Sequence, residues 1–122
     1  MIRLKRAYEA PDAADGARYL VDRLWPRGVT KDALQIAGWP KDVAPSTELR
    51  PWFGHDPAKW DEFRRRYAAE LAANPVAWQP LLAAARAGTL TLVYSAKDTR
   101  HNDAVVLKVF LEERLADAGN RS

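Results

Sequence analysis

The chain has 122 residues and contains no cysteine. This absence excludes disulfide bonds, thiolate chemistry and cysteine-ligated zinc. The sequence also lacks any apolar run approaching the roughly 18 residues that span a bilayer. Its first six residues alternate charged and apolar side chains instead of forming the apolar core of a signal peptide. By elimination, we expect a cytoplasmic protein with no membrane partner.

Histidine is scarce, and the two present are His55 and His101. Each stands near the start of an expected helix and close to an aspartate, Asp56 or Asp98. Histidine and carboxylate can together bind a metal ion. Neither pair has an HExxH or comparable spacing, so we predict no metal site, and no residue pattern points to a particular cofactor.

Charge of neither sign dominates the sequence. It carries 19 Lys and Arg against 16 Asp and Glu, a net charge of +3, with 48% hydrophobic and 29% charged residues. This balance is typical of a globular protein, and the length fits one domain over residues 1–122. A nucleic-acid binder usually concentrates its cations. The one concentrated candidate here is the run 64–66, three consecutive arginines.

The hydrophobic pattern predicts strands alternating with helices. Strands are expected over 2–6, 18–23 and 89–95. Helices are expected over 31–36 and 48–53, from Pro57 to the break at Asn74-Pro75, from Trp78 or Pro80 to Ala87, and over 102–118. This order indicates an α/β fold, a single small domain with a mainly parallel sheet of about three to four strands flanked by helices. The pattern leaves open whether the first two strands are parallel or form a hairpin.

The helix after residue 56 has the clearest pattern. Asp56 is its expected N-cap and Pro57 its first residue. Arg65 should face outward between flanking Arg64 and Arg66, so we interpret the run as a solvated surface rather than a nucleic-acid contact. The opposite face should be one buried stripe of side chains at three- and four-residue spacing, Trp60, Phe63, Tyr67 and Leu71.

The loop after the second strand, residues 22–28, is the first candidate for function. Arg23 and Arg27 flank a rigid Trp25-Pro26 corner, and each guanidinium offers a fork of donors suited to phosphate or carboxylate. Asp22 could contact a ligand beside them. The alternative is structural, with an Asp22–Arg23 ion pair and Trp25 in the core.

The loop between the last strand and the last helix is the second candidate. The N-terminus of a helix attracts anions, and Lys97 would add a positive charge beside it. His101 could move a proton near neutral pH, as could Asp98. Either Asp98 or Asn102 is expected to cap the helix, which leaves both able to contact a ligand.

Ser46 is a third candidate, outside these two loops. Its hydroxyl could contact a ligand or act as a nucleophile, but no G-x-S-x-G turn surrounds it. In the run 46–49, Ser-Thr-Glu-Leu, it fits equally well as the cap of the next helical turn, and we favour that interpretation.

Ligands of parallel sheets bind outside the carboxyl ends of the strands, where both loops should lie. We therefore predict a site for a small anionic, phosphate-bearing ligand. The cations and the helix N-terminus would bind the anion, and His101 or Asp98 would transfer protons if the protein is an enzyme. The predicted ligand contacts are Asp22, Arg23, Arg27, Ser46, Lys97 and Asn102, and the predicted catalytic residues are His101 and Asp98.

Two other functions fit the same residues. A nucleic-acid-binding module would use these cations together with Arg50 and the arginines of 64–66. A protein-interaction domain would expose its tryptophan-bearing loops, with Trp25 and Trp52 forming an apolar patch.

Motifs throughout the chain resemble the YeaO-like proteins, a bacterial and archaeal family catalogued as Domain of Unknown Function 488. The resemblance implies the fold and the site location and brings no established activity. The matching motifs are LVDRLWPRG at 20–28, APS at 44–46, LR at 49–50, WF at 52–53, HDP at 55–57, Trp60 with Phe63 and Tyr67, AKD at 96–98 and HN at 101–102.

Longer proteins that look similar at the same two loops have a Cys-x-Glu motif at the end of the last strand, which runs on to Cys-His-Arg. This chain departs from them, with Tyr94 in place of the first cysteine and Asn102 in place of the arginine after His101. Cysteine-dependent chemistry therefore does not carry over.

Overall fold

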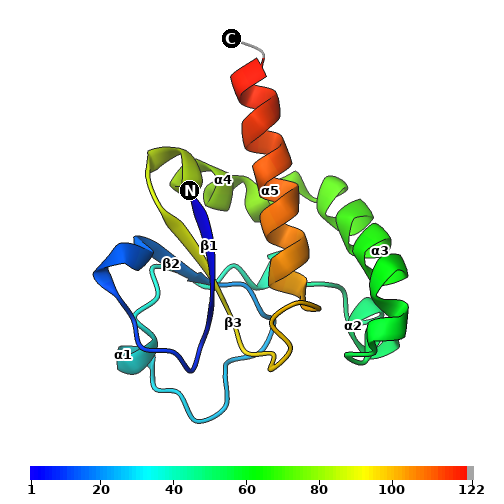
Figure 1. The fold of residues 1–122 in the computed structure, drawn as a ribbon, viewed down its shortest axis with the longest axis horizontal. Helices are drawn as coiled ribbons and strands as arrows, with labels where there is room; N and C mark the ends of the chain where they lie inside the picture. The colour runs from blue at the N-terminus through cyan, green and yellow to red at the C-terminus, as the bar shows by residue number, and fades with distance from the viewer. Residues whose placement is uncertain (121–122) are drawn as a thin grey trace.

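In the computed structural model, which describes residues 1–120, a parallel sheet of three strands is flanked by five α-helices (Figure 1). The strands are β1 (Ile2–Arg6), β2 (Ala17–Leu20) and β3 (Leu90–Tyr94), in the order β1-β3-β2. The sequence prediction of a small α/β fold with a mainly parallel sheet is confirmed.

Strand β3 occupies the centre of the sheet and is buried along its whole length. An uninterrupted apolar run is typical of such a strand, because both of its faces are covered. The first two strands do not form a hairpin: each pairs in parallel with β3, with Ile2 opposite Leu90 on one side and Ala17 opposite Leu90 on the other.

Strand β2 is shorter than predicted. The Val21 amide still bonds to the Val93 carbonyl at 3.1 Å, but the next link is made by a side chain, since the Asp22 carboxylate accepts the Ser95 amide. Asp22 and Arg23, expected within the strand, therefore lie in the loop that follows it.

The helices are α1 (Lys31–Leu34), α2 (Leu49–Phe53), α3 (Trp60–Ala72), α4 (Pro75–Ala87) and α5 (Asp103–Asn120). Helix α4 begins at Pro75, before the predicted start, because proline fits the first position of a helix, where no amide partner is needed. Residues 57–59, expected within the third helix, form a separate 3₁₀ turn capped by Asp56. Within residues 1–120, no helix is long and apolar enough to cross a membrane.

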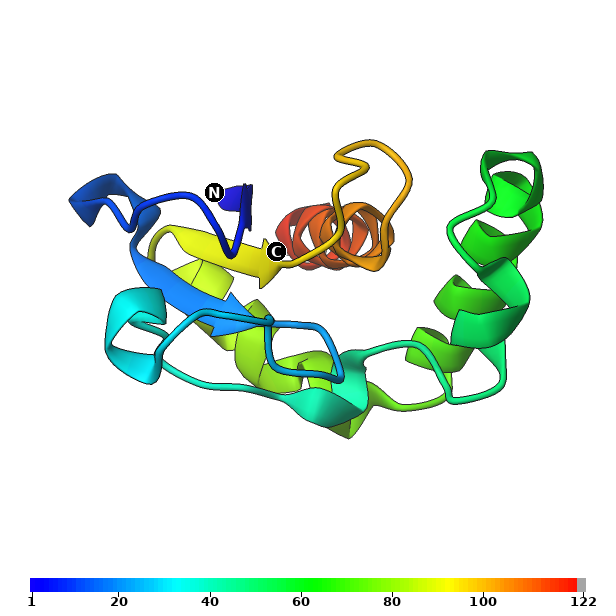
Figure 2. The same ribbon diagram turned by 90° about the horizontal axis from the view of Figure 1, so that it is seen from below.

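Helices α4 and α5 pack on the sheet, and α3 packs against both of them (Figure 2). Phe63, Tyr67 and Leu71 are buried in this main core, as predicted, whereas Trp60 at the end of α3 is only partly buried. A second, smaller cluster on the other face of the sheet contains Leu20, Leu34, Val93 and Ala7.

A buried ion cluster closes the turn before β2. Asp15 is 0% exposed and its carboxylate lies 2.7 Å from Arg18 and 3.1 Å from Lys5, with Arg3 at 3.6 Å. Burial alone would raise the pKa of Asp15, but hydrogen bonds from the Asp12 amide, Lys5 and Arg18 outweigh it and hold the pKa below its ordinary value.

We predict that Asp15→Asn lowers the free energy of unfolding at pH 7 by about 2–3 kcal/mol, because it leaves buried Arg18 without its charge partner. The direction in which this stabilisation changes with pH follows from the lowered pKa of Asp15. The contribution of Asp15 is complete above the unfolded pKa of about 3.9 and is lost as the pH falls through the native pKa.

Urea denaturation at pH 7 and at several lower pH values tests this. The difference between the wild type and Asp15→Asn should shrink as the pH falls below about 4. Asp61→Asn, which removes the exposed partner of Arg64, is the control and should cost under about 1 kcal/mol. An equal loss in both variants would contradict the structural role of Asp15.

Candidate functional site

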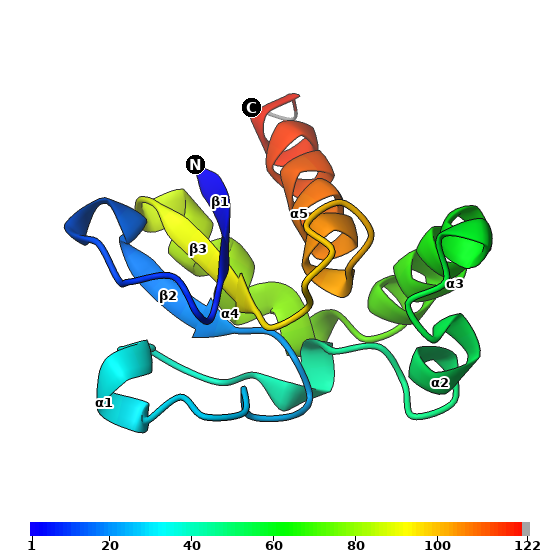
Figure 3. The ribbon, with the colours of Figure 1, turned by 60° about the horizontal axis from the view of Figure 1, so that its bottom comes forward.

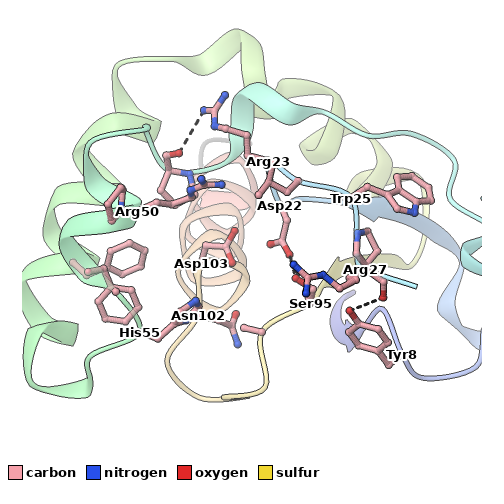
Figure 4. Close-up of a pocket in the computed structure, with 18 residues that line it drawn as sticks. Tyr8, Asp22, Arg23, Trp25, Arg27, Arg50, His55, Ser95, Asn102 and Asp103 are labelled. Atoms are coloured by element: carbon pink, nitrogen blue, oxygen red, sulfur yellow. Dashed lines mark hydrogen bonds between the residues drawn. The ribbon is translucent and has the colours of Figure 1, made fainter. Parts of the chain in front are cut away.

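The loops after β2 and β3 leave the same edge of the sheet, on the side where α2 and the first turn of α5 lie (Figure 3). They enclose a cavity of about 630 Å³, which we call the carboxyl-edge cavity. It holds residues from both predicted functional loops, and its polar lining residues are Tyr8, Asp22, Arg23, Arg27, Arg50, His55, Ser95, Asn102 and Asp103 (Figure 4).

Asp22 ties the two loops together. One of its carboxylate oxygens accepts both the amide and the hydroxyl of Ser95, each at 2.8 Å. The alternative interpretation, an Asp22–Arg23 ion pair, is wrong, because no such pair forms within the described residues.

Asp103, the first residue of α5, lies beside Asp22 in the lining of the cavity (Figure 4). Burial, the negative charge of Asp22 and a hydrogen bond to its side chain raise the pKa of Asp103 well above the ordinary value. We call Asp22 and Asp103 the carboxyl pair. Burial and the neighbouring carboxylate thus disfavour the ionised form of Asp103.

The start of α5 is capped by Asn102, one of the two residues expected to do so. The Asn102 side-chain oxygen accepts the Val105 amide at 3.1 Å, and its side-chain nitrogen donates to the Asp98 carbonyl at 2.9 Å. Asn102 therefore lines the cavity while its amide group holds the loop and the helix in place.

Three arginines line the cavity from separate segments: Arg23 and Arg27 after β2, and Arg50 in α2. None of them forms a salt bridge with a carboxylate of the part of the chain that is described. The terminal nitrogen of Arg23 donates a long 3.4 Å bond to the Pro45 carbonyl, and its buried Nε atom has no hydrogen-bond partner. The cavity thus contains guanidinium donors not used by the fold.

The walls between these charges are largely apolar. Phe53 and Phe63 stack with their ring centroids 4.2 Å apart, and both line the cavity. Trp25, which the alternative interpretation placed in the core, is only partly buried. It packs edge-on against Trp39, and its indole N–H donates to the Val29 carbonyl at 2.6 Å.

His55 belongs to the lining, on the stretch of chain that leaves α2. It follows Gly54, and both residues have a positive φ, 57° for His55 and 54° for Gly54. A histidine in this left-handed conformation is uncommon, and such residues are often found where the backbone is fixed by function.

Three residues of the second predicted loop lie outside the lining: Lys97, Asp98 and His101. Lys97 is exposed, and His101 bonds to Asp98 at 2.9 Å while its ring meets Trp60 edge-on at 5.2 Å. The Arg100 amide and then His101 lower the pKa of Asp98. The roles of these three residues in ligand binding or catalysis stay predictions.

Ser46 also lies outside the cavity. Its hydroxyl accepts the Leu49 amide at 3.0 Å and so caps α2, the interpretation favoured from the sequence. Its own amide donates to Glu70 of α3 at 2.9 Å, which fixes α2 beside the cavity.

The arginine run 64–66 is on the exposed face of α3, as expected. Arg64 pairs with Asp61, and both Arg65 and Arg66 pair with Glu62. These contacts neutralise part of the only concentrated positive charge found in the sequence.

Five polar residues of the lining were not among the site residues predicted from the sequence: Tyr8, Arg50, His55, Ser95 and Asp103. Arg50 was considered only for nucleic-acid binding, and Asp103 looked like an ordinary acidic residue in the first turn of a helix, a position that favours negative charge. The only sequence signal for Asp103 is its place directly after the predicted loop.

The comparisons place the chain within a known family. The family model described as "Inactive DUF488-N3 subclade" matches residues 1–122. The chain belongs to the YeaO-like DUF488 family. The resemblance noted from the sequence motifs is thereby confirmed.

Two relatives show how far the similarity extends. The chain is 44% identical over 110 residues to "Uncharacterized protein YeaO" of Escherichia coli K12, covering 90% of this chain and 96% of the relative. It is 41% identical over 113 residues to "Uncharacterized protein Rv3073c" of Mycobacterium tuberculosis H37Rv, and the match covers 93% of this chain and 95% of the relative. No solved structure gives a significant match.

We predict that Asp103→Asn stabilises the unliganded protein at pH 7 by about 1 kcal/mol, as replacements in strained functional sites often do. Because the pKa of Asp103 is raised in the native wild type, the native state keeps a proton on Asp103 at pH values where the unfolded state has lost it, above about pH 3.9. The free energy of unfolding of the wild type therefore falls as the pH rises above that value. Thermal melts from pH 3.5 to 8 check this: the gain should vanish at the acidic end. A destabilised variant at pH 7 would show that Asp103 acts as a charged helix cap.

Proposed function

We propose that the protein binds a small phosphate-bearing anion in the carboxyl-edge cavity. The observation that carries this proposal is the convergence of Arg23, Arg27 and Arg50 on one cavity without carboxylate partners within the described chain. Guanidinium groups recognise phosphate through paired hydrogen bonds. The volume of 630 Å³ falls in the range usual for small-molecule sites, roughly 300–1,000 Å³.

The electrostatic balance supports an anionic ligand. Three arginines and the carboxyl pair line the cavity. Because three guanidinium groups outnumber two carboxyl groups, these five residues have a net positive charge even when both carboxyls are ionised. A phosphate group would neutralise it and occupy the unused guanidinium donors.

The arginines, rather than the start of α5, are assigned as the main phosphate ligands. The first amides of α5 already have acceptors in the side chains of Asn102 and Asp103. Lys97, one residue beyond Ala96 of the lining, would add attraction at longer range. We expect its contribution to be smaller than that of an arginine inside the cavity.

The structure gives less support to the two other functions. The arginines at 64–66 are paired with acids on their own helix, which weakens the case for a nucleic-acid surface. Trp25 and Trp52 are both partly buried, which weakens the case for an exposed aromatic patch.

A binding role is also favoured over turnover. The subclade whose model matches is described as "inactive", and His101 and Asp98, which would move protons in an enzyme, are not among the lining residues.

A thermal-shift screen of inorganic phosphate, sugar phosphates and nucleotides tests the proposal, since a ligand that binds only the native state raises the melting temperature. We expect Arg27→Ala and Arg50→Ala each to weaken binding of the best phosphate compound at least tenfold, because each removes a charged hydrogen-bond donor.

Arg64→Ala is the matched control, because Arg64 is an exposed arginine outside the cavity and should leave the affinity unchanged. Lys97→Ala is expected to weaken binding about threefold or less, as a peripheral charge would. Equal affinities in the wild type and both cavity variants would rule out the carboxyl-edge cavity as the anion site.

A further inference from the structure

Two exposed apolar side chains at the carboxyl-edge cavity are not accounted for by a phosphate alone. Leu24 is 65% exposed and Tyr8 is 49% exposed, and both line the cavity. We call these two residues the apolar rim. Single exposed apolar residues are ordinary on a protein surface, but two beside one cavity indicate a contact with an apolar group. This inference rests on the proposed function and concerns the organic group that carries the phosphate.

Tyr8 is held in place although it is exposed. Its hydroxyl donates to the Arg27 carbonyl at 3.1 Å, and the Arg6 guanidinium lies 5.1 Å from the centre of its ring. These contacts join the loop after β1 to the loop after β2 and keep Tyr8 beside Arg27 at the cavity (Figure 4). Because the ring is fixed before a ligand binds, contact with it costs little conformational entropy.

Leu24 has no part in the packing of the fold. It belongs to neither hydrophobic core of the described chain, whereas the next residue, Trp25, packs against the smaller one. An apolar ligand group that covered the Leu24 side chain would remove its surface from water, which favours binding.

Other apolar residues continue the lining inward from the apolar rim. Pro26, Phe53 and Phe63 are buried and line the same cavity. Aromatic faces and edges pack well against another aromatic ring. A hydroxyl-rich group placed against these walls would lose hydrogen bonds to water without replacing them.

We propose that the ligand is an aryl phosphate, a phosphate monoester whose aromatic group contacts Tyr8 and Leu24 while its phosphate meets Arg27. Arg27 supplies the complementary charge directly beside the Tyr8 ring, and in an aryl phosphate a single ester oxygen separates the ring from the phosphate. The cavity volume of about 630 Å³ also accommodates a larger aromatic group than phenyl.

Isothermal titration of the wild type with phenyl phosphate, methyl phosphate, ribose 5-phosphate and inorganic phosphate tests the inference. Methyl phosphate is the matched ligand, because it is a monoester of the same charge without the ring. Phenyl phosphate should bind at least tenfold more tightly than methyl phosphate and ribose 5-phosphate. A tenfold ratio requires the burial of only about 55 Å² of apolar surface.

Two results of this titration would overturn the inference and leave the proposed anion site intact. One is equal binding of the three esters. The other is tighter binding of ribose 5-phosphate, which would show that the carboxyl pair recognises sugar hydroxyls. Absence of binding by any phosphate compound would refute the proposed function itself.

Variants locate the preference at the apolar rim. Leu24→Ala and Tyr8→Ala should each weaken the binding of phenyl phosphate at least threefold and leave the affinity for methyl phosphate unchanged. Val76→Ala is the matched control, because Val76 is 77% exposed on α4 and lies outside the lining. Wild-type affinity for phenyl phosphate in both rim variants would overturn the inference.

Sedimentation velocity of the wild type and Leu24→Ala distinguishes a ligand from a second copy of the chain as the group that covers the apolar rim. We expect the same sedimentation coefficient for both. Self-association that Leu24→Ala abolishes would assign the apolar rim to a protein interface and would overturn the inference.

Discussion

The arrangement of the carboxyl-edge cavity depends on the hydrogen bonds from Ser95 to the carboxylate of Asp22. They join the loop after β2 to the loop after β3 at the point where the backbone ladder stops. A side-chain oxygen takes over from a backbone carbonyl, so two loops are held together without a longer strand. The same bonds hold the Asp22 side chain in a fixed position in the lining of the cavity.

The cavity combines features that oppose stability. An acid with a raised pKa stands at the start of α5, arginines lack carboxylate partners in the described chain, and His55 adopts a positive φ. Two other groups of charged residues are paired, the Asp15 cluster and the arginines on α3. Such a contrast is typical of a binding site, where groups are held ready for a ligand at a cost to the empty protein.

Much of the fold could be read from local patterns. The apolar run of β3 and the periodicity of α3 predict their structures because burial acts on each segment directly. Element ends were less predictable: β2 stops early because of Asp22, and α4 starts early because Pro75 suits the first helical position. Trp60 continues the α3 stripe in sequence, yet it lies at the helix end, where the packing partners become fewer.

By itself, the sequence determined the α/β class, the positions of the loops that follow β2 and β3, the cap at Ser46 and the solvated arginine run. Each of these follows from neighbours within a few residues, through helix geometry or local hydrogen bonds. Only the tertiary structure decided that Arg50 and Asp103 enter the cavity while Lys97, Asp98 and His101 stay outside its lining. Those positions depend on how α2 and α5 pack around the sheet, and side-chain direction within a loop is fixed by contacts made across the fold.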